Sequence, residues 1–379
     1  MKPKQLYPLA LAVSFATSVA AQDITIGVTM GTTGASASFG ISYKNAFQLM
    51  PKAIGGQPVK FIIYEDNADA KIAANNARKL ITEDKVDALM GSVSLLSTTQ
   101  VAQIAHDLKT PLLALAPVVL TYDKLEWVFV LPQRPGLMMS AVIEHMKAHG
   151  VKTVGYIGFA DVWGDFILNA VNNVGWNAAG IQTVDVERYA RTDTSVTAQV
   201  MKLLAANPDA ILVGGSGAGS ALPHAALVMR GYNKQIYHNH GTVSREFIKA
   251  GGKAVEGAIA PSGPLMVAED LPEDNPVKPV ALDFINRYEQ TFGERSRNAF
   301  SGYSYDGYLL LNAAVPVATQ TAKPGTPEFR QALRDALENV HNVVGTHGIY
   351  NMTAKDHSGL DDRARVLVRI ENGEWQLLK

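Results

Sequence analysis

Short runs of apolar residues alternate with amphipathic stretches over most of this chain. The amphipathic stretches between them place apolar side chains at helical spacing. Strands that alternate with helices of this length predict parallel sheets that are covered on both faces. The strand-like runs are 24–28, 59–64, 86–90, 111–116, 153–157, 181–186 and 210–213.

The pattern changes in the last third of the chain. Residues 261–279 are rich in Pro, Glu and Asp and are expected to form a connection. Helical runs follow at 277–292, 303–320 and 327–340, the last with Thr326 as a cap and Pro327 at its first position. The tail, 364–378, alternates as two strands would around a turn at Asn372-Gly373.

Length and composition indicate a globular protein with two domains. A chain of 379 residues exceeds what one hydrophobic core usually organises, and 47% of its residues are hydrophobic. The formal charge is −1 and no run of Lys or Arg occurs, so we expect no nucleic-acid partner.

The N-terminus has the features of an export signal. Lys2 and Lys4 precede a short apolar core at 9–15, and small residues follow at 18–21. The apolar stretch is shorter than the roughly 20 residues that a membrane-spanning helix needs. We therefore expect residues 1–21 to be a signal peptide, cleaved near Ala20 or Ala21, and the mature protein to reach the periplasm. The chain has no cysteine, which excludes a lipidated cysteine at the junction and any disulfide.

Two sequence motifs have features of enzyme or metal sites. Gly215-Ser216-Gly217 with Gly219 superficially suggests a dinucleotide site, but Ser220 stands at its last glycine position, and Ala218 breaks the nucleophile-elbow pattern. His238 and His240 lie two apart on an expected strand, and no third metal ligand is identifiable nearby. We expect one of these histidines to line a cleft and the other to be buried. The sequence thus predicts no cofactor, no metal and no catalysis.

The ends of the strands are the more informative feature, because ligands of open α/β sheets gather beyond the carboxyl ends of strands. Leu96, Ser97 and Thr98 lead directly into a helix, whose free N–H groups and dipole suit a carboxylate. The alternative is that Ser97 or Thr98 only caps that helix.

Several segments together resemble the branched-chain amino-acid type of periplasmic binding protein, the type I solute receptors of ABC transporters. The resemblance covers essentially the whole mature chain. It is carried by residues 24–40, 64–66, 77–81, 87–91, 155–157, 163–164 and 208–210.

This resemblance implies a two-lobed clamshell that the chain crosses three times and that closes over its ligand. The crossings are expected near 131–136, 260–265 and 345–351. Lobe 1 would then hold 23–134 and 263–346, and lobe 2 would hold 135–262 and 347–379.

The resemblance also implies the ligand-binding residues. The family's carboxylate-binding positions match Ser97, Thr98 and the backbone at Ala116, and its aromatic positions match Phe39 and Trp163. Further cleft positions match Ser216, Gly217, His240 and, more weakly, Tyr303. Leu96, Val118, Arg134 and Gly241 are additional candidates, although Arg134 could equally be a solvated hinge residue.

Two departures from the family suggest the kind of ligand. Amino-acid binders usually have a carboxylate where this chain has His240, and a threonine where it has Val118. A buried ammonium without an anionic partner is costly, so we expect a ligand with a carboxylate and no α-amine. The chain also resembles a branch that binds aromatic acids such as benzoylformate and phenylpyruvate, through residues 156–159, 240–241 and 246–248.

We therefore expect a monomeric, non-enzymatic receptor that binds a small aromatic carboxylate and delivers it to the permease subunits of an ABC importer. Two alternatives stay open: an amino-acid binder of the same fold, and a periplasmic sensor that presents its ligand to a signalling receptor. The aromatic residues could also serve only to pack the core between the lobes.

Overall fold

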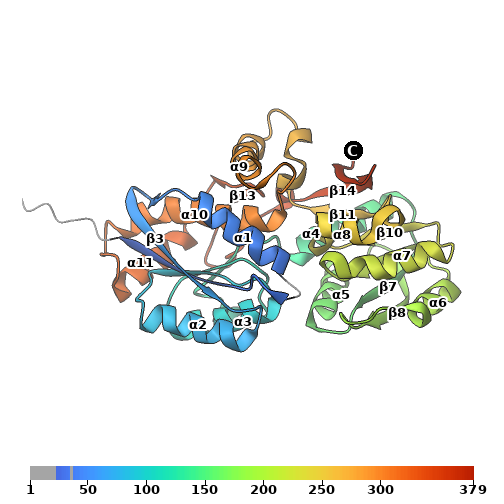
Figure 1. Ribbon diagram of the computed structural model, residues 1–379, viewed down its shortest axis with the longest axis horizontal. Coiled ribbons are helices and arrows are strands. Elements are labelled where there is room, and N and C mark those ends of the chain that lie inside the picture. Colours follow the sequence, from blue (N-terminus) through green and yellow to red (C-terminus); the bar gives the residue numbers. More distant parts are fainter. Residues whose placement is uncertain (1–22, 35–36) are drawn as a thin grey trace, which may run out of the picture.

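The computed structural model describes residues 23–34 and 37–379, which form two α/β lobes side by side (Figure 1). Each lobe has one mainly parallel sheet with helices on both faces, so the predicted fold class is confirmed. The predicted signal peptide, residues 1–21, lies outside the described residues.

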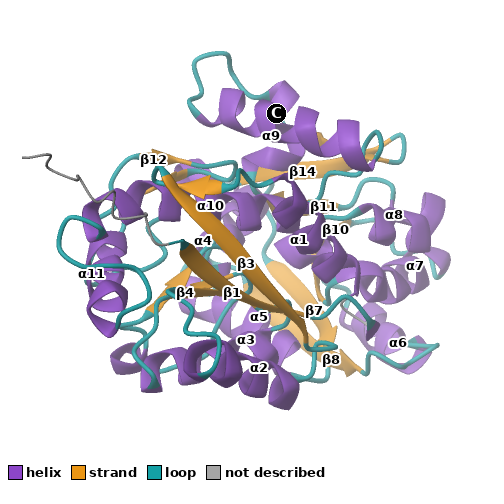
Figure 2. Ribbon diagram, turned by 60° about the vertical axis from the view of Figure 1, so that its left-hand side comes forward, coloured by secondary structure: helices purple, strands orange, loops and turns teal. Residues whose placement is uncertain are grey.

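The first lobe is built on a six-stranded sheet in the order β2-β3-β1-β4-β5-β6. Neighbouring strands pair in parallel except β2, which forms a hairpin with β3. β1 lies between β3 and β4 (Figure 2), and Val28 of β1 pairs with Ile63 of β3 and Met90 of β4. The strands are β1 (Ile24–Met30), β2 (Ala53–Ile54), β3 (Gln57–Glu65), β4 (Ala88–Gly91), β5 (Leu112–Ala114) and β6 (Val128–Val130).

Alternating side chains of this sheet pack into two separate apolar clusters, one on each face. Met90 packs into the cluster shared with α1, α10 and α11, whereas its neighbour Leu89 packs into the cluster shared with α2 and α3. The continuous apolar runs in the sequence follow from burial on both faces. The helices are α1 (Ala37–Leu49), α2 (Ala70–Thr82), α3 (Leu95–Asp107), α10 (Ala299–Ala318) and α11 (Pro327–Glu338).

The second lobe has a seven-stranded sheet in the order β15-β14-β11-β10-β9-β7-β8. Strands β14 and β15 form an antiparallel hairpin. Asn372 and Gly373 at its turn have φ of 54° and 74°, which confirms the predicted hairpin. The strands are β7 (Thr153–Phe159), β8 (Gln182–Tyr189), β9 (Ala210–Gly214), β10 (Gln235–His238), β11 (Ile259–Ser262), β14 (Val366–Glu371) and β15 (Glu374–Leu377).

Helices also cover both faces of the second sheet (Figure 1). Tyr156 of β7 packs with α4 and α5, and the next residue, Ile157, packs with α6 and α7 on the opposite face. The helices are α4 (Pro135–Ala148), α5 (Val162–Val174), α6 (Thr197–Ala206), α7 (Ala221–Met229) and α8 (Arg245–Gly251).

Side-chain caps begin several of these helices where the sequence supplies Asp, Ser, Thr or Asn. The Asp161 carboxylate accepts from the N–H groups of Trp163 and Gly164 at the start of α5. Thr326 caps α11 through the N–H of Phe329 at 3.1 Å, as predicted. Caps of this kind fix the first residue of a helix and therefore fix which side chains stand at its end.

The segment expected to be a connection, 261–279, contains regular structure. It holds the end of β11, the 3₁₀ segment η6 (Pro264–Asp270) and the beginning of α9 (Val277–Phe292). Apolar residues of η6 and α9 pack together in one cluster with Ala46 of α1. Although it is rich in proline and acidic residues, the segment contributes Leu265, Val267 and Ala268 to the interior.

The chain passes between the lobes after β6, after β11 and before β14. Residues that follow the short strands β12 (Val343–Val344) and β13 (Ile349–Tyr350) still pack in the first lobe, among them Met352, Leu360 and Ala364. We therefore propose that the third crossing lies near Arg365 rather than at the expected 345–351.

Among the described residues, no helix combines the length and the apolar character needed to cross a membrane.

Candidate ligand-binding site

A cavity of about 330 Å³ lies between the two lobes. Its lining residues come from the loops that follow β3 to β10 in both sheets, and from the first turns of α1 and α10. In each sheet these loops leave the carboxyl ends of the strands, where ligands of open α/β sheets bind, and the two sets of loops face each other. The lobes touch across it: a Cβ atom on Gly217 would lie 3.4 Å from Cζ of Phe39.

Aromatic rings form much of the cavity wall. The rings of Phe39 and Phe300, both from the first lobe, stack with centroids 4.0 Å apart. Trp163 stands opposite at the start of α5, and its indole nitrogen donates to the carbonyl of Gly215 at 3.0 Å. Tyr303 also lines the cavity and is almost completely buried. Stacking holds Phe39 and Phe300, and a hydrogen bond holds Trp163, so these three rings are fixed before any ligand arrives.

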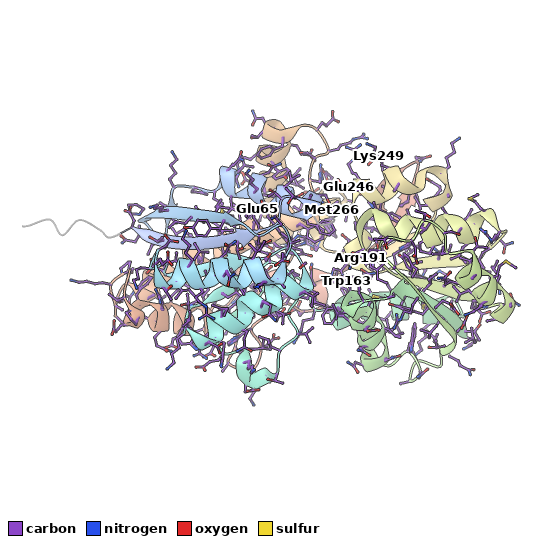
Figure 3. The ribbon with its side chains drawn as sticks, turned by 60° about the horizontal axis from the view of Figure 1, so that its bottom comes forward. Glu65, Trp163, Arg191, Glu246, Lys249 and Met266 are labelled. Carbon is purple, nitrogen blue, oxygen red and sulfur yellow. The ribbon has the colours of Figure 1, made fainter. Side chains whose placement is uncertain are left out.

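An ion pair within the cavity was not predicted from the sequence. Arg191, just after β8, donates from Nε to Oδ2 of Asp161 at 2.6 Å and lies over the ring of Phe159. Figure 3 shows Arg191 and Trp163 on the second lobe, on the side that faces the first lobe. Both carboxylate oxygens of Asp161 are engaged, since Oδ1 caps α5. The two terminal nitrogens of Arg191 make no hydrogen bond to any described residue, so its charge can still meet an anion.

His240 contributes a neutral imidazole to the same cavity. Burial lowers its pKa to about 4, so the ring is uncharged at pH 7. Its Nδ1 is buried without a hydrogen-bond partner among the described residues, and the ring meets Trp163 edge-on at 6.0 Å. A polar ring left with an unused nitrogen beside a cavity is a candidate ligand contact.

The other histidine of the pair lies elsewhere. His238 is fully buried and shares a 2.8 Å hydrogen bond between its Nε2 and Nδ1 of His224. The prediction that one histidine lines the cleft and one is buried is confirmed. The prediction that both lie on one strand is wrong, because β10 ends at His238 and Asn239 caps the 3₁₀ turn η4 (His240–Thr242). In the part of the chain that the structure describes, no three acidic, histidine or cysteine side chains cluster as metal ligands would.

Ser97 and Thr98, expected to bind a carboxylate, are fully buried and do not line the cavity. Ser97 Oγ accepts a hydrogen bond from Ser94 Oγ, and Thr98 Oγ1 accepts one from the N–H of Ser92. Ser94 is the residue that caps α3 and lines the cavity, so neither Ser97 nor Thr98 is the cap. The first turn of α3 does reach the cavity, through Ser94 and Leu96.

The remaining predicted residues divide between two cavities. Ser216, Gly241 and Ala116 line the cavity between the lobes, and Gly217 lies beside it. Val118 and Arg134 instead line a second cavity of about 500 Å³ beside the first crossing. There Arg134 pairs with Asp356 at 3.1 Å, with its side chain more than half exposed.

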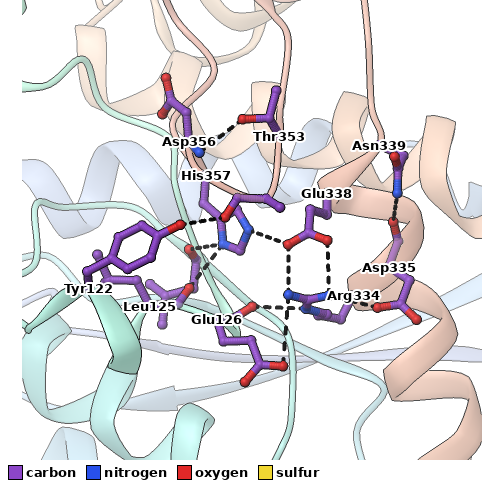
Figure 4. A network of polar contacts seen from close by, with 12 residues as sticks. Tyr122, Leu125, Glu126, Arg334, Asp335, Glu338, Asn339, Thr353, Asp356 and His357 are labelled. Atoms are coloured by element: carbon purple, nitrogen blue, oxygen red, sulfur yellow. Dashed lines mark hydrogen bonds and ion pairs between the residues drawn. The ribbon is translucent and has the colours of Figure 1, made fainter.

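A polar network holds one wall of that second cavity. Arg334 and His357 both contact Glu338, at 2.7 and 3.0 Å, and His357 Nδ1 lies 3.0 Å from the carbonyl of Leu125 (Figure 4). These contacts attach residues 353–358 to the edge of the first sheet. They give Arg134 a fixed partner at the hinge, rather than a ligand.

The sequence interpretation missed Asn67, Ala68, Ser94, Asp161, Arg191 and Phe300, which all line the cavity. Asp161 could have been found, since an Asp two residues before Trp163 is a typical N-cap. Arg191 was missed because β8 was expected to end at 186 and continues to Tyr189. Phe300 was missed because α10 begins at Ala299 rather than 303.

The fold and the cavity together define a two-lobed α/β protein with a candidate ligand site between its lobes. The model of the family described as "Periplasmic binding protein" matches residues 23–374, and the chain therefore belongs to that family. Two curated relatives have the names of binding proteins, a Leu/Ile/Val-binding protein homolog and an amino acid binding protein.

Three comparisons illustrate the range of similarity. An extracellular ligand-binding receptor from Rhodopseudomonas palustris HaA2 is 44% identical, with a TM-score of 0.91, over 94% of this chain and 100% of that one. The Leu/Ile/Val-binding protein homolog 3 of Brucella melitensis is 28% identical over 89% of each chain. An ABC-transporter solute-binding protein from R. palustris, solved in complex with benzoate, has a TM-score of 0.75 at 18% identity, over 94% of this chain and 96% of that one. This last similarity shows the fold alone.

Proposed function

We propose that this protein binds a small aromatic carboxylate in the cavity between its lobes and delivers it to an ABC importer in the inner membrane. One observation carries the proposal: the cavity combines aromatic walls, an arginine with free terminal nitrogens and a neutral imidazole. The aromatic walls match the ring of an aryl acid, the arginine matches its carboxylate, and the imidazole matches a keto or carboxylate oxygen.

The size and lining of the cavity favour a compact, flat ligand. Its volume of about 330 Å³ is at the low end for small-molecule sites, which span roughly 300–1,000 Å³. Phe39 and Phe300 offer a stacked pair from the first lobe, and Trp163 offers a ring from the second. A ligand ring that contacts both lobes favours the closed state, because those contacts exist together only there.

Arg191 supplies the charge for the carboxylate. Its Nε is engaged by Asp161, and the terminal nitrogens remain available for a two-point contact with a carboxylate. His240, being neutral, adds a hydrogen bond to a keto or carboxylate oxygen without adding charge. Ser94, Ser216 and the backbone at Ala116 supply further polar groups along the wall.

Leucine or another amino acid is the second candidate, and the Arg191–Asp161 pair is the observation that favours it. If Arg191 turned to a ligand carboxylate, Asp161 Oδ2 would be free to hold an ammonium group. Two curated relatives, at 28% and 25% identity, are named as binding proteins for Leu/Ile/Val and for amino acids. Against this candidate, Asp161 already caps α5, and turning Arg191 away would break a 2.6 Å ion pair.

A thermal-shift titration separates the two candidates. The purified protein is titrated with benzoylformate, phenylpyruvate, benzoate and leucine. We expect stabilisation by the aryl acids, since a ligand that binds only the folded state raises the melting temperature. Stabilisation by leucine alone would reject the aromatic assignment. Co-purification with the permease subunits would then distinguish delivery to a transporter from presentation to a signalling receptor.

A further inference from the structure

The three chain crossings between the lobes meet at one buried side chain, Gln133. Gln133 lies in the first crossing, between β6 and α4, and is fully buried. Its Nε2 donates to the carbonyl of Ala364, just before the third crossing, at 2.9 Å. A Cβ atom on Gly263, in the second crossing, would lie 2.6 Å from the same Nε2. The amide therefore contacts all three segments about which the lobes must rotate.

The other end of the same amide is held by a residue of the ligand cavity. Tyr303 lines the cavity with its ring, and its hydroxyl donates to Gln133 Oε1 at 2.8 Å. Burial raises the pKa of this hydroxyl, so it stays protonated and remains a donor. A continuous chain of hydrogen bonds thus runs from the cavity wall to the crossings.

His347 supports this chain from the side. Its ring packs on Tyr303 with centroids 4.4 Å apart, and its Nε2 lies 2.8 Å from the carbonyl of Ala299 at the start of α10. Since a carbonyl only accepts, Nε2 carries the proton and Nδ1 faces Gly263, where a Cβ atom would lie 2.0 Å away. Glycine is required at this point of the second crossing, so the backbone there is in direct contact with His347 and Gln133.

We propose that Gln133 is a positioning residue that couples ligand contact at Tyr303 to closure of the lobes. Gln133 does not line the ligand cavity, and its role is to hold the crossings in the arrangement that brings the lobes together. A ligand that fixes the Tyr303 ring also fixes the donor of the 2.8 Å bond, which stabilises the closed arrangement by differential contact. The proposal rests on ligand binding between the lobes and does not depend on which acid is bound.

Tyr303→Phe is the direct test, because it removes the hydroxyl and keeps the ring. Tyr308→Phe is a matched control on the same helix, since its hydroxyl bonds the carbonyl of Ala53, far from the crossings. The chain has no cysteine, so cysteines placed at the exposed Gln100 and Asn173 would label one site on each lobe for distance measurement by fluorescence energy transfer.

In the ligand-free protein we expect Tyr303→Phe to lower the closed-to-open ratio on the order of tenfold, and Tyr308→Phe to leave it unchanged. With benzoylformate as the probe, Tyr303→Phe should release it on the order of tenfold faster while association changes little. Gln133→Met should reproduce both effects, and the double variant should add nothing further.

Equal closed-to-open ratios in Tyr303→Phe and Tyr308→Phe would overturn the proposal, as would strictly additive effects of the Tyr303 and Gln133 changes. The ligand-free measurement keeps the test separate from the proposed function, because it needs no ligand. If Gln133→Met fails to fold, the ligand-free ratio of Tyr303→Phe alone decides the matter.

Discussion

At the scale of single residues, the site depends on how charge is distributed between Arg191, Asp161 and His240. The Asp161 carboxylate accepts hydrogen bonds at the start of α5 and pairs with Arg191, and burial keeps the His240 imidazole neutral. The terminal nitrogens of the Arg191 guanidinium remain available to bind a ligand. That balance favours an anion without a cation, and it yields two predictions.

Replacing Arg191 with Gln removes the charge and keeps a polar side chain. We expect benzoylformate affinity to fall by about 10- to 100-fold, because a hydrogen bond to a charged group contributes about 1.5–3 kcal/mol. Isothermal titration measures the change, and Lys249→Gln, at an exposed site on α8, is the control. Unchanged affinity in Arg191→Gln would show that the carboxylate binds elsewhere.

Replacing His240 with Ala removes the neutral donor beside Trp163. Aryl-acid binding should weaken by about tenfold, since one hydrogen bond contributes about 1 kcal/mol and a small void adds to the loss. Leucine binding need not change. The control is His341→Ala, an exposed histidine, and a variant that binds benzoylformate as the wild type does would contradict the role given to His240.

At the scale of elements, the cavity depends on helices that stand directly on strand ends. Helix α5 carries Trp163 at its start. Gly164 sets the position of the helix against β7, because a Cβ atom at Gly164 would lie 2.0 Å from the carbonyl oxygen of Phe159. No side chain fits there without moving the helix away from β7. The glycine pattern of the sequence thus determines where the aromatic wall stands.

Gly164→Ala should therefore destabilise the protein by about 3 kcal/mol or more, an overpacking effect against backbone that cannot yield. Gly136→Ala in α4 is a matched control, because its Cβ atom would meet a methyl group of Val174 at an ordinary 3.4 Å. Denaturant unfolding compares the two variants. Equal stability of both variants would refute the packing argument.

Most elements could be predicted from the sequence, because strands buried on both faces and capped helices leave strong local patterns. The site was less predictable, since its members depend on element ends and on side-chain direction. Extending β8 by three residues to Tyr189 brings Arg191 into the cavity, and one cap at Ser94 turns Ser97 and Thr98 inward. Periodicity does not resolve such short shifts in helix and strand ends.

At the scale of the whole molecule, several histidines are buried in the neutral form. Burial lowers the pKa of His224, His240 and His347 to about 4, and that of His238 well below its ordinary value. Between pH 6.5 and 4 the unfolded chain binds more protons at these sites than the folded protein does. Stability must therefore fall as the pH falls through this window.

The carboxyls of Asp66, Asp87 and Asp306 act in the opposite direction, because burial raises the pKa of each. The pKa of Asp306 is raised to about 6, so its contribution favours the folded state at low pH and is lost as the pH rises through 6. We expect the histidines to dominate and the melting temperature to drop by about 5–10 °C from pH 7 to pH 4.5. Calorimetry across this range measures it, and a flat or rising profile would contradict the argument.

The arrangement of the whole molecule around its cavity is tested most directly by a crystal structure with benzoylformate bound. The account predicts the ligand ring against Phe39 and Trp163, its carboxylate on the terminal nitrogens of Arg191, and the His240 imidazole directed at a ligand oxygen. An empty cavity at saturating benzoylformate, or an α-amine bound to Asp161 in its place, would contradict it.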